Sequence, residues 1–123
     1  MMKLLLIDDD AFLRDMYAIK FGEQGYEVEV ADSPHDGLLK LDRDQDFDII
    51  LLDMIMPGMD GTELIQKIYQ DFPKIKAKCI VLSNQGQQED MDAAMKAGAI
   101  GYIIKADTVP SDVVKKVDEL SKK

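Results

Sequence analysis

The sequence is poor in cysteine and in positive charge, and it contains no long apolar run. Its single cysteine, Cys79, excludes an intrachain disulfide; within the apolar run 79–82 we expect a buried, reduced thiol. The formal net charge of −9 disfavours direct binding to nucleic acid or to anionic membranes and favours metal cations or basic protein partners. The first apolar run, 4–7, is too short for a signal peptide or a membrane span, so we expect a cytoplasmic protein.

Short apolar runs alternate along the chain with longer amphipathic segments, and the runs cover residues 4–7, 28–31, 49–52, 79–82 and 100–104. Four of them lack polar alternation, as strands buried on both faces do, whereas the run 28–31 is interrupted by Glu29 and is expected at a sheet edge. The length of 123 residues fits one domain covering residues 1–123. We therefore predict an α/β fold: a doubly wound, flavodoxin-like (βα)5 parallel sheet with strand order 2-1-3-4-5.

Helical spacing of apolar residues predicts which side of each connecting segment faces the core. We expect Phe12, Met16 and Ile19 to form the buried stripe of the first helix. The stripes expected on three later helices are Leu64, Ile68 and Phe72; Met91, Ala94 and Met95; and Val113, Val117 and Leu120. Ser33-Pro34 is expected to open the second helix, and Gly98 to end the fourth.

Polar side chains follow four of the five predicted strands. Asp8 and Asp9 come directly after the first strand, Asp53 ends the third, Ser83 ends the fourth and Lys105 follows the fifth. In an open α/β sheet these carboxyl ends meet at one edge, where ligands bind. Three converging carboxylates repel one another unless a cation lies among them, and an open site with few oxygen ligands favours Mg²⁺. Asp53 is then a candidate nucleophile toward phosphorus, with Mg²⁺ and the lysine stabilising charge on the transferred group.

Each of these residues also has a purely structural interpretation. The run Asp8-Asp9-Asp10 could cap the first helix, Asp53 could be a turn residue, Ser83 could cap a loop, and Lys105 could be a solvated charge. Their joint occurrence at four strand ends of one sheet edge favours a functional site. The single histidine, His35, has no histidine or cysteine companion for a metal site, so we expect an exposed helix residue.

Four sequence segments together are similar to the receiver domain of two-component response regulators: LLIDD at 5–9, DIILLDMIMPGMDG at 48–61, IVLS at 80–83 and GAIGYIIK at 98–105. The similarity extends over essentially the whole chain, and the organisation resembles that of stand-alone receivers such as the chemotaxis response regulator. The resemblance implies a phosphorylation-activated signalling switch in a two-component phosphorelay.

The resemblance implies a role for each matching residue of the acidic pocket. Asp53 corresponds to the phosphoacceptor, and Asp8 and Asp9 correspond to the acidic pair that holds Mg²⁺. Ile55 lies where the family supplies a backbone carbonyl to the metal, and its side chain occupies the place that positions the hydrolytic water. Gln85, two residues after the switch hydroxyl, is a second candidate for orienting that water.

The resemblance also implies the parts of a switch. Ser83 corresponds to the hydroxyl that moves to the phosphoryl group, Tyr102 to the aromatic residue that rotates inward behind it, and Lys105 to the lysine that pairs with the phosphate. The implied donor is a histidine kinase or phosphotransfer protein. The implied output is a protein target bound by the fourth helix, fifth strand and fifth helix.

Two positions depart from the family pattern. Ala106 stands where the family commonly has proline after the lysine. A cis bond before alanine costs about 3–4 kcal/mol, so we expect a trans peptide and a different loop path. Asn84 replaces the usual small residue after the switch hydroxyl and adds bulk at the entrance to the phosphorylation site.

Other functions fit the sequence less well. Aspartate-nucleophile phosphatases and phosphotransferases need a second aspartate two residues after the nucleophile, where this chain has Ile55, so we do not expect a dedicated enzyme. A flavodoxin-like cofactor binder needs a glycine-rich loop after the first strand, where this chain has three aspartates. A receiver domain excised from a larger regulator or hybrid kinase remains open as an alternative.

Overall fold

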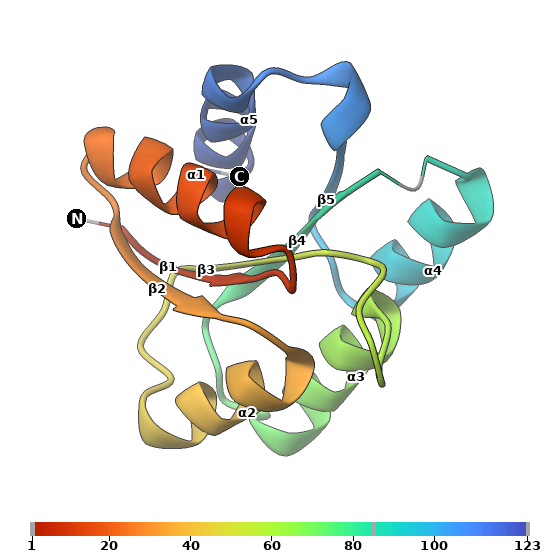
Figure 1. Ribbon diagram of the computed structural model, residues 1–123. Helices are drawn as coiled ribbons and strands as arrows, with labels where there is room; N and C mark the ends of the chain where they lie inside the picture. Colours follow the sequence, from red (N-terminus) through yellow and green to blue (C-terminus); the bar gives the residue numbers. More distant parts are fainter. Residues whose placement is uncertain (1, 85, 123) are drawn as a thin grey trace.

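The computed structural model describes residues 2–84 and 86–122. Strands and α-helices alternate along the chain (Figure 1). The strands are β1 (Lys3–Ile7), β2 (Glu27–Ala31), β3 (Ile49–Leu52), β4 (Lys78–Ser83) and β5 (Gly101–Ile104). The helices are α1 (Ala11–Glu23), α2 (Pro34–Arg43), α3 (Gly61–Asp71), α4 (Gln88–Ala97) and α5 (Pro110–Ser121), with a 3-10 turn η1 at Lys105–Asp107. Within the described residues, no helix has the length and apolarity needed to cross a membrane.

The five strands form one parallel sheet in the order β2-β1-β3-β4-β5, which confirms the predicted topology. The strand β2 lies at an edge, as its alternating sequence predicted. The central strands β1 and β3 pair in register, with Leu4 opposite Ile49 and Ile7 opposite Leu52. Because these two strands stop together, the residues that follow them emerge side by side.

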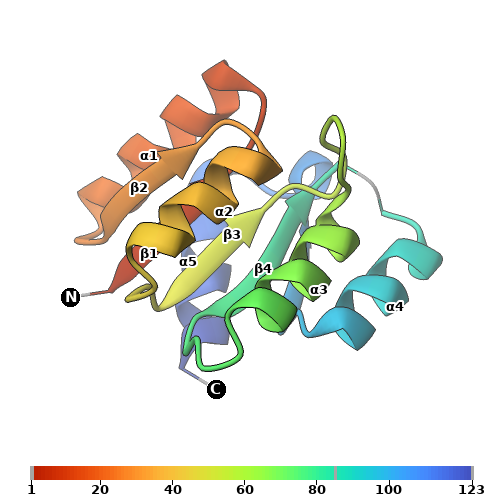
Figure 2. The ribbon, with the colours of Figure 1, turned by 90° about the horizontal axis from the view of Figure 1, so that it is seen from below.

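Helices cover both faces of the sheet (Figures 1 and 2). Alternate strand residues point to opposite faces, so Leu4 and Leu6 pack under α1 and α5, while Leu5 and Ile7 belong to the core beneath α2 and α3. The strands β1 and β3 are almost entirely buried, which explains their unbroken apolar sequences. Two apolar layers therefore hold the strand ends in place.

The stripe predicted for α1 was wrong for Phe12 and Ile19, whereas Met16 is partly buried against the core. Phe12 and Ile19 are 76% and 62% exposed, and the helix instead buries Tyr17 and Phe21 against the sheet. Apolar residues occur on two sides of this helix, and the side with two aromatic rings packs inward because it removes more apolar surface from water. Phe21 also makes an edge-to-face contact with Tyr26 at 5.1 Å between ring centroids.

The other helices follow their predicted faces more closely. Leu64 and Ile68 of α3 and Phe72, the C-cap of that helix, are buried, and Val113 and Val117 of α5 are buried. In α4 only Ala94 is fully buried, and Met95 is exposed, so this methionine is not the core residue we expected. The predicted caps are confirmed: Ser33 accepts from the Asp36 amide ahead of Pro34, and Gly98 ends α4 with φ of +124°.

Candidate functional site

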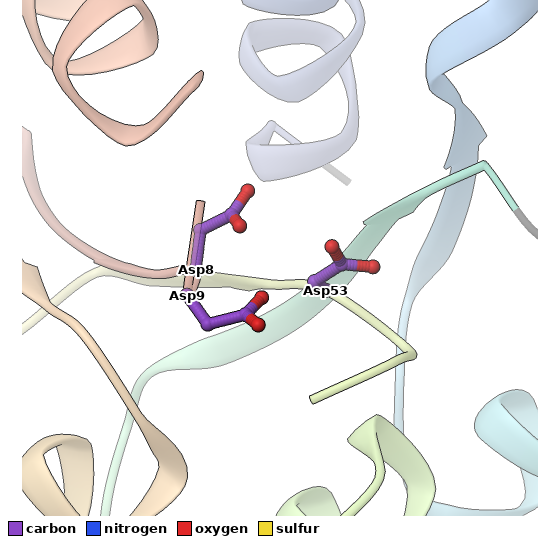
Figure 3. A group of neighbouring side chains, drawn as sticks. All are labelled: Asp8, Asp9 and Asp53. Atoms are coloured by element: carbon purple, nitrogen blue, oxygen red, sulfur yellow. The ribbon is translucent and has the colours of Figure 1, made fainter. Parts of the chain in front are cut away.

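Three carboxylates lie together at the carboxyl ends of β1 and β3 (Figure 3). Asp8 and Asp9 directly follow β1, and Asp53 directly follows β3. One oxygen from each side chain lies within 4.8 Å of the others. The amide of Asp53 donates to the Ile7 carbonyl at 3.2 Å, so the backbone continuing the β1–β3 ladder fixes the spacing. The predicted convergence of these residues is observed.

Lys105 joins two of the three carboxylates. Its Nζ lies 3.1 Å from Asp8 Oδ2 and 3.1 Å from Asp53 Oδ2, and its side chain is 6% exposed. Burial alone lowers the pKa of Lys105, but the charges of Asp53 and Asp8 outweigh burial and raise that pKa overall. The ammonium group thus supplies part of the positive charge that the carboxylates need.

Asp8 is the most buried member of the cluster, with 2% of its surface exposed. Burial raises the pKa of this carboxyl, because a charge is poorly solvated there. The hydrogen bond from the Asp10 amide and the charge of Lys105 both act in the opposite direction without cancelling the effect of burial. Asp8 therefore holds its negative charge at a cost, which an additional cation would reduce.

The three consecutive aspartates after β1 have different structural roles. Asp10 is the N-cap of α1, and its side chain accepts from the Leu13 amide at 3.1 Å. The Asp10 amide in turn donates to Asp8 Oδ1 at 3.0 Å. The capping interpretation thus holds for Asp10 alone, while Asp8 and Asp9 lie in the acidic cluster.

The loop after β3 forms the other wall of the site. The Ile55 amide donates to Asp53 Oδ1 at 3.3 Å, and the Ile55 side chain is 56% exposed. Helix α3 begins at Gly61, where an added Cβ would lie 2.8 Å from the Asp53 carbonyl oxygen, so only glycine allows this close approach. The resulting cavity has a volume of about 350 Å³ and is lined by Asp9, Asp10, Leu13, Asp53, Ile55, Ser83, Asn84 and Lys105.

Ser83 and Tyr102 connect this cavity to the sheet edge at β5. Ser83 is 1% exposed at the end of β4, and Tyr102 lies on β5, which pairs with β4. Burial raises the pKa of the Tyr102 hydroxyl, and its hydrogen bond with Ser83 partly offsets that rise. Tyr102 also packs against the core formed with α3 and α4. A displacement of Ser83 would consequently change the contacts of Tyr102.

The two loops above β4 and β5 complete the rim. Asn84 is exposed and lines the cavity, while Gln85, a predicted water-orienting residue, lies outside the described residues. Residues 2–84 and 86–122 contain no cis peptide bond, which confirms the trans peptide expected before Ala106. The chain there forms the 3-10 turn η1. The hydroxyl of the following Thr108 is buried and has no hydrogen-bond partner among the described residues.

Two singled-out residues lie away from the cluster. His35 is exposed on α2, as expected. Cys79 is a buried free thiol, and burial raises its pKa to about 12, so it stays protonated and unreactive.

The sequence interpretation missed Arg14, whose Nη1 donates to the Asp8 carbonyl at 2.9 Å. A lone cation one turn into the helix that follows an acidic pair was the available signal.

Residues 4–118 match the family model of the response regulator receiver domain. The chemotaxis protein CheY of Thermotoga maritima is 36% identical over 122 residues, covering 98% of each chain. The transcriptional regulatory protein AfsQ1 of Streptomyces coelicolor is 35% identical over 105 residues, which are 85% of this chain and 45% of that one. The crystal structure of a CheY-like receiver domain protein from Methanospirillum hungatei superposes with a TM-score of 0.88 at 31% identity, covering 99% and 94% of the two chains.

The chain therefore belongs to the response regulator receiver domain family. Members of this family are signalling proteins of two-component systems, and phosphorylation-dependent switching is their general function. The side chains of Asp8, Asp9 and Asp53 form an acidic cluster that could hold a metal ion.

Proposed function

We propose that a single receiver domain spanning residues 1–123 accepts a phosphoryl group on Asp53 and signals through a changed protein-binding surface. The observation that carries the proposal is the pocket that Asp53 shares with two further carboxylates and a buried lysine, whose Nζ lies 3.1 Å from Asp53 Oδ2. One carboxylate must act as nucleophile while positive charge is held beside it. Asp8 contacts the lysine without lining the cavity and Asp9 lines the cavity without an ion pair to the lysine, whereas Asp53 does both.

The donor set fits Mg²⁺, because it consists of hard carboxylate oxygens in an open cavity that leaves room for water and phosphate oxygens. Asp8, Asp9 and Asp53 would hold the ion together with the backbone carbonyl of Ile55. When bound, Mg²⁺ supplies charge stabilisation for the phosphoryl oxygens.

The proposed transfer needs no acid or base from the chain. An Asp53 carboxylate oxygen forms a bond to phosphorus while the bond from phosphorus to the imidazole nitrogen of the donor breaks, and that nitrogen keeps the electron pair and takes a proton from solvent. The donor is accordingly the phosphohistidine of a histidine kinase or phosphotransfer protein. Lys105, which already touches Asp53, would pair with a phosphoryl oxygen.

Phosphorylation would then draw Ser83 toward the phosphoryl group. Tyr102 would follow because its hydroxyl is hydrogen-bonded to that of Ser83. Tyr102 lies on β5, between α4 and α5, so this movement biases the surface formed by those three elements toward one of two states. We propose that a protein target binds there, in the cytoplasm, with no direct contact to nucleic acid or membrane. The net charge of −9 supports a protein target.

An alternative is that the chain is one domain of a longer regulator or hybrid kinase. Relatives of the AfsQ1 kind support it, because this chain spans about half of their length. The chemistry at Asp53 would be the same, and only the recipient of the signal would change.

The test of the proposed function is phosphorylation by a small phosphodonor with Mg²⁺, with the label mapped by mass spectrometry. The parent should carry one phosphoryl group on Asp53, and Asp53→Asn should carry none. The matched control is Asp42→Asn, which removes the same charge from an exposed position on α2 and should label like the parent. Equal labelling of Asp53→Asn and the parent would overturn the assignment.

A further inference from the structure

The carbonyl group of Asp8 lies at the point where the sheet ladder between β1 and β2 ends. The Asp8 amide still donates to the Ala31 carbonyl at 3.1 Å. The next rung of a parallel ladder would bring the Ser33 amide to the Asp8 carbonyl, but Ser33 has left the strand to become the N-cap of α2. The sheet therefore supplies no donor for this carbonyl, and Arg14 Nη1 supplies one from the first turn of α1 at 2.9 Å.

This hydrogen bond fixes the peptide unit that joins Asp8 to Asp9. The other contacts of Asp8 are at its amide, which donates to the Ala31 carbonyl, and at its side chain, which accepts from the Asp10 amide and from Lys105. The side chain of Asp9 accepts no hydrogen bond and forms no ion pair within residues 2–84 and 86–122, and it is exposed. Its direction into the cluster consequently depends on the backbone, and that backbone is held by Arg14.

We propose that Arg14 is a positioning residue of the acidic pocket: its guanidinium group orients the Asp8–Asp9 peptide so that the Asp9 carboxylate faces Asp53. The inference rests on the proposed function in one respect, namely that the pocket binds Mg²⁺. Arg14 forms no ion pair within the described part of the chain, and its guanidinium group donates a hydrogen bond to the Asp8 carbonyl. A guanidinium group suits the task because it is planar, always charged and carries several donors.

The positioning role and a simple charge effect predict opposite results. A cation beside a metal site repels Mg²⁺, so removing its charge should tighten Mg²⁺ binding if charge were its only influence. If Arg14 positions Asp9, removing it should weaken binding even though a repulsive charge is lost. The loss expected for a residue that orients a metal ligand is about tenfold to 100-fold in affinity.

The experiment is calorimetric titration of purified Arg14→Met, Arg14→Lys and parent protein with MgCl₂, without any phosphodonor. Arg14→Met should bind Mg²⁺ at least about tenfold more weakly than the parent, and Arg14→Lys should recover most of the loss because its ammonium group can still donate. The matched control is Arg43→Met, which removes the chain's only other arginine from an exposed position at the end of α2. It should bind Mg²⁺ as well as the parent or more tightly.

Metal-free thermal melts separate misfolding from misplacement of Asp9. If Arg14→Met melts early, Arg14→Gln takes its place, since glutamine removes the charge but keeps a donor. Unchanged or tighter Mg²⁺ binding by a folded, charge-free Arg14 variant would overturn this inference and leave the proposed function standing. Absence of Mg²⁺ binding by the parent would overturn the metal role in the proposed function, and the inference with it.

Discussion

Ile55 places an apolar side chain, 56% exposed, two residues from the carboxylate that we propose is phosphorylated. Hydrolysis of an acyl phosphate needs a water in line with phosphorus and a neighbour that orients it. Ile55 offers no hydrogen bond, and Asn84 adds a side chain to the same cavity. The phosphoryl group on Asp53 should therefore be long-lived, and its removal should depend on another protein.

We expect Ile55→Asn and Ile55→Glu to accelerate loss of phosphate several-fold, because either side chain can hold the attacking water. Release of inorganic phosphate from purified phosphoprotein measures this. Ile19→Asn is the control, since it makes the same exchange at an exposed isoleucine on α1. Equal decay of the parent and both Ile55 variants would show that Ile55 does not limit hydrolysis.

The buried carboxylate of Asp8 should reduce stability in the absence of metal. Burial raises its pKa above the ordinary value of 3.8, so the ionised group destabilises the fold at pH values above the folded-state pKa. We expect Asp8→Asn to raise the free energy of unfolding at pH 7 in metal-free buffer by roughly 0.5–2 kcal/mol, the range common for single stabilising substitutions. Urea unfolding at several pH values measures the effect.

The stability difference between Asp8→Asn and the parent should depend on pH. As pH falls through the raised pKa of Asp8, the folded parent takes up the proton before the unfolded chain does. The penalty then disappears, so the difference between the parent and Asp8→Asn should narrow in acid. Asp9→Asn, at an exposed member of the cluster, should show no comparable gain. A less stable Asp8→Asn at neutral pH would mean that its contact with Lys105 outweighs the cost of burial.

Among the structural elements, the segment joining β5 to α5 contains an unfavourable group. In the part of the chain that the structure describes, the buried Thr108 hydroxyl has no hydrogen-bond partner, and an unpaired buried hydroxyl costs about 1–3 kcal/mol. Thr108→Val replaces it with a methyl group of similar shape and should stabilise the protein by about 1 kcal/mol. Thermal denaturation tests this against Thr62→Val, whose hydroxyl has a partner in Met54 Sδ at 3.6 Å. A destabilised Thr108→Val would indicate that the hydroxyl is satisfied by water.

The elements α4, β5 and α5 should respond together to phosphorylation. Ser83 and Tyr102 connect the pocket to β5, so a phosphate mimic bound at Asp53 should shift amide NMR signals throughout these elements. Signals from α2, on the far side of α3, should change little. The same mimic added to Asp53→Asn is the control. Shifts restricted to the loops around Asp53 would argue against an allosteric output surface.

The secondary-structure elements that are buried on both faces were predictable from the sequence. The strands β1 and β3 are covered on both faces, so their sequences are apolar throughout, and the parallel sheet follows. The inward face of α1 was not predictable from spacing, because Phe12 and Ile19 fit a helical stripe as well as Tyr17 and Phe21 do. The choice between them depends on packing against a sheet that the sequence pattern does not describe.

In the site, too, the residues placed by strand order were predictable and the contacts set by local packing were not. Its five main residues follow strand ends, and strand order brings them together, so sequence was sufficient for Asp8, Asp9, Asp53, Ser83 and Lys105. The position of Arg14 one turn after the acidic pair was a signal that it lies near the site, but its hydrogen bond to the Asp8 carbonyl depends on where β2 stops pairing, which the sequence pattern does not show.

For the molecule as a whole, a net charge of −9 and a pocket with three carboxylates should make stability depend on divalent cations. An ion that binds only the folded state at 100 times its Kd adds about 2.7 kcal/mol. We expect MgCl₂ to raise Tm well beyond NaCl of equal ionic strength, and Asp9→Asn to lose this difference. Identical melting in the two salts, with no heat of Mg²⁺ binding, would exclude the metal site.

The strand order has a consequence for a chain that is being synthesised. Of the five strands, β1 is synthesised first, yet its place is between β2 and β3. Its second neighbour, β3, does not exist until residue 52 has been added, so Leu4 to Ile7 keep one unpaired edge while residues 8–48 are made. Once β3 arrives, β4 and β5 join the same side in the order of translation, and the nascent sheet then grows outward from β3.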